Sequence, residues 1–288
     1  MSLASSSYGQ IRVDSRMYTT SGSCAQCDLS GRTLTGMTLR DSNFAGAQFN
    51  RANLSGGNFD RSDLSGTQFK RAFLARVEGQ SVNMAHASFQ DATMTEAKFD
   101  SAILTNSNLQ RADISRANFT RSDFADADLT SATAPNVNFE GSKFVNARFD
   151  HMNLRNAKLD GAKFHNVKFG NSILIGATMV AADFSKADLS EVQGLQQAQL
   201  DTACGDSQTR LPMGLSLAYC ERHESGVHNS TDHADLSPKM ARAAKRLDKA
   251  IVNVEALLLE TDSSDKALRR RLQRIHSDLM SSRRAIEN

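Results

Sequence analysis

The sequence predicts an all-β solenoid, a right-handed quadrilateral parallel β-helix of about eight coils, followed by a C-terminal α-helical hairpin. Three observations lead to this fold class. Every fifth residue from Leu29 to Leu189 is Leu, Phe, Ile or Met, with Gly79 and Ala134 as the exceptions. Two positions before the large residue stands a small one, as in Ala112 before Ile114. Beyond residue 237 the apolar spacing changes to three and four, which is typical of helices.

Residues 1–23 come first and are expected to form an N-terminal cap or extension, because a solenoid needs its terminal apolar face covered. They contain no apolar run long enough for the core of a signal peptide. No later segment has the roughly eighteen apolar residues of a membrane span. Only four of the 288 residues are cysteines, which fits a reducing compartment. The expected location is therefore the cytoplasm.

Residues 24–195 form the predicted solenoid, because a period of five suits neither a straight helix nor a straight strand. Five helical residues advance about 500°, and five strand residues reverse the direction of the side chain. The chain must therefore turn a corner in every repeat, and the two residues after the large one are rich in turn formers. Four such repeats, with one corner each, close a square coil. Stacked about 4.8 Å apart, the coils make a rod roughly 35 to 40 Å long.

The repeat resembles that of the pentapeptide-repeat family. The resemblance is carried by Ala47-Gln-Phe-Asn-Arg, Ala52-Asn-Leu-Ser-Gly, Ala112-Asp-Ile-Ser-Arg and Ala187-Asp-Leu-Ser-Glu. It implies a right-handed quadrilateral β-helix. Some family members resemble duplex DNA and protect DNA gyrase, an activity that depends on a strongly acidic rod. Here residues 24–195 carry 18 basic and 18 acidic residues, so their net charge is zero.

The interior of the coils is expected to be filled by stacked columns of like side chains. One column is aliphatic from Leu34 to Leu174, and the other three are rich in Phe. This packing leaves no cavity for a substrate or cofactor. Gly79 and Ala134 interrupt two of the columns and mark either voids or a bend, or a local repacking around Val77 and Val82; close packing favours repacking.

Surface residues that stand four repeats apart are neighbours in this fold. Asp123, Lys143, Lys163 and Asp183 share one column, which predicts a solvated salt-bridge ladder, with an anion site as the alternative. A corner column carries cations that form either a solvated basic edge or a partner-binding site. These candidate residues are Arg51, Arg71 and Arg111.

Residues 196–236 are expected to be a C-terminal capping segment and linker. Cys204 and Cys220 are placed beyond the last coil, where they pack or form a disulfide if the compartment is oxidising. Cys24 and Cys27 have the spacing of half a zinc site, but Cys27 occupies an inward small-residue position, so we expect it in the core. No metal ligands, cofactor-binding residues or catalytic residues are predicted.

Residues 237–288 are expected to form a helical hairpin or coiled coil that carries a net charge of +5. Its apolar seams are candidates for self-association, and its basic residues are candidates for binding a partner. The candidate self-association residues are Leu247, Val254, Leu257, Leu272, Ile275 and Leu279. The candidate partner-binding residues are Lys245, Arg246, Lys249, Arg269, Arg270, Arg271 and Arg274.

These features predict a non-enzymatic interaction or scaffold protein. Its rigid rod offers flat faces, and its helical tail dimerises or docks onto a protein partner of unknown identity. The first alternative, implied by the family resemblance, is a protein that protects DNA gyrase or another topoisomerase. The second is a nucleic-acid contact through the basic hairpin.

Overall fold

The computed structural model describes residues 24–220, Val254, Leu272, residues 275–276 and Leu279. The chain divides into two compact units, residues 1–222 and 223–288, and each is described by itself. The predicted cap at residues 1–23 lies outside the described residues. No helix among the described residues is both long and apolar enough to cross a lipid bilayer.

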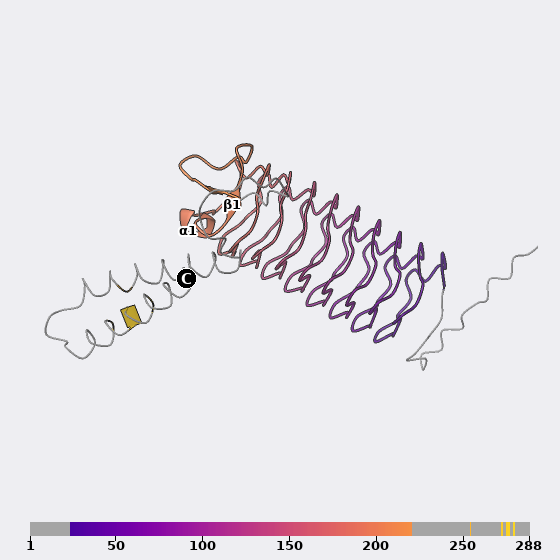
Figure 1. The fold of residues 1–288 in the computed structure, drawn as a ribbon. Coiled ribbons are helices and arrows are strands. Elements are labelled where there is room, and N and C mark those ends of the chain that lie inside the picture. The colour runs from indigo at the N-terminus through magenta and orange to yellow at the C-terminus, as the bar shows by residue number, and fades with distance from the viewer. Residues whose placement is uncertain (1–23, 221–253, 255–271, 273–274, 277–278, 280–288) are drawn as a thin grey trace, which may run out of the picture. The chain divides into compact units, whose positions relative to one another are not determined.

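Stacked four-sided coils form the body of the first unit (Figure 1). Parallel bridges connect each outward residue with the residue 20 positions later, and eight such steps lead from Asp28 to Asp188. The Phe124 N–H donates to Lys143 O at 2.8 Å, and the Asp123 N–H donates to Ala102 O at 2.9 Å. Turns separate the bridges, one at each corner. The predicted coil count and register are therefore confirmed.

The residue just before the large one explains why Asp and Asn recur in the repeat. Its side chain caps the corner that follows: Asp123 Oδ1 accepts the Ala125 N–H at 3.0 Å. Gln68 occupies this capping position in another repeat. There Asn50 of the preceding coil supplies the cap, and its Oδ1 accepts the Lys70 N–H at 3.1 Å. The second corner residue adopts a left-handed conformation, as at Arg121 with φ 58°. These caps give the corner amides the partners that a buried or crowded N–H requires.

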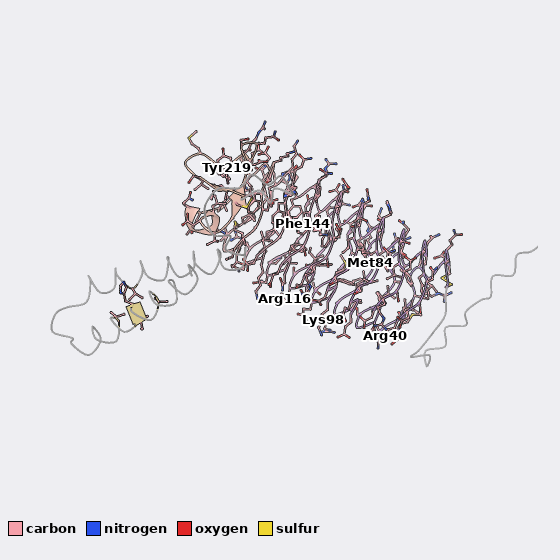
Figure 2. All side chains as sticks on the ribbon, in the orientation of Figure 1. Arg40, Met84, Lys98, Arg116, Phe144 and Tyr219 are labelled. Atoms are coloured by element: carbon pink, nitrogen blue, oxygen red, sulfur yellow. A yellow bond between two sulfur atoms is a disulfide. The ribbon has the colours of Figure 1, made fainter. Side chains whose placement is uncertain are left out.

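The core is a set of columns of buried side chains that run through the coils. Phe124, Phe144 and Phe164 stack on one another, with ring centroids 5.0 and 5.1 Å apart. Phe139 and Phe149, on the neighbouring faces, meet Phe144 edge-on at 4.9 and 5.0 Å. Figure 2 labels Phe144 within the stack. All five rings are fully buried, so the interior of these coils is filled as predicted.

Buried hydroxyl groups connect neighbouring coils inside this apolar core. Ser122 is completely buried; its Oγ donates to Phe99 O at 2.7 Å and accepts the Ala102 N–H at 3.1 Å. Ser142 repeats the arrangement one coil later with Phe119 O, at 2.6 Å. Serine is thus accepted at the inward small position because both of its hydrogen-bonding roles are satisfied by the backbone.

Gly79 marks a repacked part of the core, and the alternative of a void is wrong. A Cβ built on Gly79 would lie 2.7 Å from Phe99 Cδ1 and 3.2 Å from Val82 Cγ1. The Phe99 ring and Val82 therefore occupy the space that a large side chain fills elsewhere in the column.

Gly79→Ala is expected to destabilise the protein by about 1–3 kcal/mol, because the added methyl group overpacks the core. Urea unfolding followed by far-UV circular dichroism measures this effect. The double variant Gly79→Ala/Phe99→Leu is expected to recover part of the loss, since the smaller side chain makes room for the methyl group. A Gly79→Ala variant as stable as the parent would contradict the assigned packing.

The stack continues past residue 195, where the predicted solenoid ends. Helix α1, Gln197–Leu200, precedes strand β1, Cys204–Gly205, which pairs in parallel with strand β2, Ala218–Tyr219. Cys204 also bridges to Asp183 of the previous coil, and Arg210 bridges to Asp188. Both pairs are slightly further apart in sequence than the bridged pairs of the regular coils. The prediction that Cys204 lies beyond the last coil is therefore wrong: small insertions lengthen the final coil without ending the stack.

Disulfides join the cysteines at each end of the coils. Cys204 and Cys220 are 16 residues apart with Cα atoms separated by 4.8 Å, and their bond closes the final coil. Cys24 and Cys27 form the second disulfide, in the first described coil. Both of these residues pack partly buried against the core. The chain therefore contains no free cysteine.

Candidate functional site

Four surface cations of the early coils are neutralised by a carboxylate one coil earlier. Arg61 bonds to Asp41 at 2.7 Å, and Lys98 bonds to Glu78 at 3.1 Å. Two further arginines follow the same rule, Arg111 with Asp91 at 2.7 Å and Arg116 with Glu96 at 2.8 Å. Lys98 and Arg116 lie along one edge of the stack in Figure 2. A cation departs from this rule when the residue one coil earlier, 20 positions back in the sequence, is not acidic.

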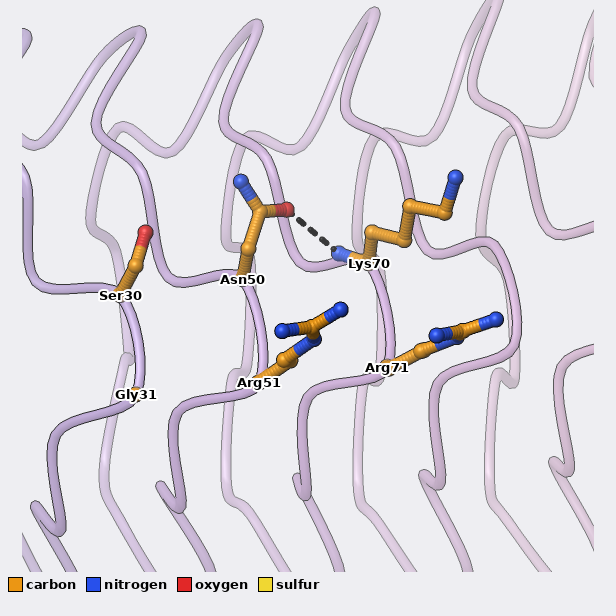
Figure 3. Close-up of a pocket in the computed structure, with 6 residues that line it drawn as sticks. All are labelled: Ser30, Gly31, Asn50, Arg51, Lys70 and Arg71. Carbon is orange, nitrogen blue, oxygen red and sulfur yellow. Dashed lines mark hydrogen bonds between the residues drawn. The ribbon is translucent and has the colours of Figure 1, made fainter.

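Arg51 and Arg71 depart from the rule in adjacent coils. The residue one coil before Arg51 is Gly31, and the residue one coil before Arg71 is Arg51 itself. Neither arginine forms an ion pair within the described part of the chain. Their side chains extend in the same direction from successive corners (Figure 3). Two like charges are thereby held side by side without a carboxylate between them.

These two arginines line an open hollow of about 460 Å³, which we call the basic pocket. Gly31 has open space where a Cβ would stand, so its corner leaves room beside Arg51. Asn50 Oδ1 accepts the Lys70 N–H, and this bond holds the corner that carries Lys70 (Figure 3). The pocket is lined by Ser30, Gly31, Asn50, Arg51, Lys70 and Arg71.

Asp91, which stands one coil after Arg71, is bound by another residue. Arg111 donates to it through Nε at 2.7 Å and through Nη2 at 3.1 Å. This hydrogen bond lowers the pKa of the Asp91 carboxyl below its ordinary value, and the positive charges of Arg71 and Lys70 act in the same direction. Asp91 therefore already holds Arg111 as its ion-pair partner and forms no direct ion pair with Arg71 or Lys70.

The structure thus divides the three corner arginines that the sequence groups together. Arg51 and Arg71 line the basic pocket and have no ion-pair partner among the residues that the structure describes, whereas Arg111 is bound to Asp91. The sequence-based prediction missed Lys70 and Asn50. A signal was available, since Lys70 immediately precedes Arg71 and the residue one coil before it is Asn50, not an acid.

The predicted salt-bridge ladder does not form. Lys143 and Lys163 have no ion pair among the described residues, although both stand in line with Asp123 and Asp183. His165 Nε2 instead lies 2.6 Å from Asp183 Oδ2. Burial raises the pKa of Asp183, but hydrogen bonds from Ser185 and His165 outweigh it and hold this pKa below its ordinary value.

Asp183 also lies beside the disulfide at the end of the stack. Asp183, Cys204 and Cys220 are the one group of three potential metal ligands found within the described residues. Cys220 Sγ lies 3.1 Å from Asp183 Oδ1, but the disulfide occupies both sulfur atoms. A disulfide sulfur is not a thiolate, so this group lacks the ligands that zinc requires.

Part of the predicted tail site is described. Val254, Leu272, Ile275 and Leu279 are helical; Val254 and Leu272 are buried, and Ile275 is exposed. The remaining candidates lie outside the described residues, and their proposed roles stay predictions. These are Leu247, Leu257, Lys245, Arg246, Lys249, Arg269, Arg270, Arg271 and Arg274.

Comparison with known proteins identifies the repeat across the coils. A model described as pentapeptide repeats (8 copies) matches residues 23–66, 58–95 and 83–121, and one described as a pentapeptide repeat region matches residues 117–194. Together these matches cover more than half of the chain. No curated protein matches the chain.

Several solved structures of pentapeptide repeat or related proteins match the chain, each at low sequence identity. One is HetL, a pentapeptide repeat protein involved in heterocyst differentiation regulation in the cyanobacterium Nostoc sp. strain PCC 7120. It is 24% identical over 67% of this chain and 86% of its own, with a TM-score of 0.38. QnrB1, a plasmid-mediated fluoroquinolone resistance protein, is 20% identical over 63% of this chain and 90% of its own, with a TM-score of 0.37. A protein of the Arabidopsis thaliana thylakoid lumen is 22% identical over 36% of this chain and 74% of its own, with a TM-score of 0.21. At these values the likenesses carry no argument about function.

Proposed function

The chain belongs to the pentapeptide repeat family, and from that premise we propose that it is a non-enzymatic interaction protein whose coils bind an anionic protein partner at the basic pocket. The observation that carries the proposal is the contrast between neighbouring corners. Arg61, Arg111 and Arg116 are each neutralised by the acid one coil earlier, whereas Arg51 and Arg71 are not.

Uncompensated like charges at adjacent corners are unfavourable unless an anion neutralises them. Arginine suits this role because its planar guanidinium binds carboxylate or phosphate through two parallel hydrogen bonds. Lys70 adds a flexible third cation at the rim of the same hollow. A carboxylate or phosphate group of a partner therefore meets three cations that line one hollow and form no ion pair among the described residues.

The filled interior supports an interaction role over catalysis. Phe144 and its ring neighbours occupy the interior of the later coils, and His151 and His165 each lie in a surface contact with an aspartate. The alternatives of gyrase protection and nucleic-acid contact through the tail rest on no feature of the described residues. Residues 24–195 have no net charge, whereas gyrase protection depends on a strongly acidic rod.

Removing the pocket cations is expected to reduce partner retention by about tenfold or more, since each hydrogen bond to a charged group contributes roughly 1.5–3 kcal/mol. The test variant is Arg51→Gly/Lys70→Gln/Arg71→Gly. Glycine preserves the backbone because Arg51 and Arg71 have φ of 60° and 58°. Proteins retained from a native-host extract by the full-length chain and the variant are compared by quantitative mass spectrometry.

The matched control removes the same charge at distant corners: Arg121→Gly/Lys186→Gly/Arg155→Gln. Arg121 and Lys186 also have positive φ, 58° and 61°. We expect proteins that both the parent and the control retain but the pocket variant loses. Identical sets from all three chains, or equal loss from both variants, would contradict the proposed role of the pocket.

A further inference from the structure

We propose that Lys143, Arg148, Lys163 and Lys168 form a second recognition surface, the cationic tetrad, which binds an extended acidic segment of a partner protein. The four residues stand on two adjacent faces of two successive coils. Lys143 bridges in parallel to Lys163, and Arg148 bridges to Lys168, so like charges lie directly opposite each other in both pairs. All four side chains are exposed.

Cross-strand like charges destabilise a sheet, and the usual remedy is a neighbouring carboxylate. Three of the four carboxylates that bridge to the tetrad hydrogen-bond to other side chains. Asp183 is held by His165 at 2.6 Å and by Ser185. Asp128 accepts from Gln110 Nε2 at 2.7 Å and from the Thr130 N–H at 2.9 Å.

Asp188 completes the set of engaged carboxylates. It accepts from Ser190 Oγ at 2.6 Å and lies 3.6 Å from Arg210. Within the described part of the chain, no member of the tetrad has an ion pair. The tetrad therefore presents four exposed cations without a direct ion pair among the described residues, although the charges of Asp128 and Asp188 act on Arg148 and Lys168.

The carboxylates around the tetrad define the shape of the ligand. Asp123 and Asp128 stand one coil before it, and Asp183 and Asp188 stand one coil after it. Coils are spaced about 4.8 Å apart, so a polyanion that ran along the stack would soon meet acids at either end. Duplex DNA is densely charged along its whole length and is much wider than two coils. An extended peptide is narrow enough to cross the two coils and avoid both pairs of acids.

Single-stranded nucleic acid is also disfavoured, because its binding sites combine cations with aromatic side chains that stack on bases. The exposed aromatic side chains among the described residues are Phe73 and Tyr219, and both lie on other coils. A peptide rich in Glu or Asp can bind through the positive charges of the tetrad alone and needs no exposed aromatic side chain. The tetrad shares no residue with the basic pocket, so this inference goes beyond the proposed function and stands apart from it.

The test uses full-length protein and a fluorescein-labelled peptide of alternating glutamate and serine, with anisotropy measured at low and at physiological salt. The test variant is Lys143→Gln/Arg148→Gln/Lys163→Gln/Lys168→Gln. The control removes four exposed cations elsewhere: Arg76→Gly/Arg121→Gly/Lys186→Gly/Arg155→Gln. The basic-pocket variant described above is measured in parallel, to separate binding at the tetrad from binding at the pocket, and a duplex oligonucleotide is the competing probe.

Saturable, salt-sensitive peptide binding is expected, weakened roughly tenfold or more in the tetrad variant and within about twofold of the parent in the four-charge control. Circular dichroism confirms that each variant is folded. No peptide binding at low salt, equal loss in the four-charge control, or tighter tetrad-dependent binding of the duplex than of the peptide would each overturn the inference. Loss in the basic-pocket variant alone would also overturn it, and would assign the peptide to the pocket.

Discussion

Replacing Phe144 by alanine is expected to lower the free energy of unfolding by about 3–5 kcal/mol. The ring is fully buried and contacts Phe124, Phe139, Phe149 and Phe164 at centroid distances between 4.9 and 5.1 Å. Alanine removes the apolar surface of the ring and leaves a cavity that the surrounding stacked rings cannot close, because each is held by its own coil.

Equilibrium denaturation followed by far-UV circular dichroism measures this loss, since the chain has no Trp. Phe73→Ala is the matched control: it makes the same chemical change at a side chain that is 51% exposed. We expect that control to change stability by less than about 1 kcal/mol. Equal effects at the two positions would mean that the Phe columns do not fill the interior of the coils.

Loss of the Cys204–Cys220 disulfide is expected to destabilise the final coil by about 3 kcal/mol, the chain-entropy value for a loop of roughly 15 residues. The bond spans 16 residues and fixes strand β2 to strand β1, which bridges to Asp183 of the preceding coil. In a solenoid each coil contacts only its neighbours, so the end coil opens without the rest.

Native-state hydrogen exchange of the Cys204→Ser/Cys220→Ser variant measures this opening. The amides of residues 204, 210 and 220, which bond across the final coil, are expected to exchange about a hundredfold faster. Cys24→Ser/Cys27→Ser is the comparison, with a smaller effect because its loop spans only 3 residues. Unchanged exchange at the C-terminal coil would show that the bridge does not hold this coil closed.

The sequence predicts the architecture well because one physical pattern, a small and a large inward residue in every five, is repeated without a slip from Leu29 to Leu189. That pattern determines the coil length, the register and which residues stack. It does not extend to the final coil, where α1 and two small insertions replace the repeat. The stack therefore continues beyond the point where periodicity is visible.

The candidate surface was only partly predictable. The sequence shows which residues are neighbours in a column, but it does not show which of several cations binds a given carboxylate. Asp183 is in line with Lys163, yet His165 from the intervening corner reaches it. Asp91 has an arginine on each side in its column and is bound by Arg111, not Arg71. Which cation stays unpaired depends on the direction and reach of each side chain, and these follow from the left-handed corners.

Recognition by unpaired cations on the outside of a filled stack of coils is tested most directly by hydrogen exchange. Exchange of the full-length chain is measured with and without a partner that the chain has captured. We expect slower exchange at residues 30, 31, 50, 51, 70 and 71, which line the basic pocket. Unchanged exchange at these residues, with protection confined to other coils, would contradict recognition at the pocket.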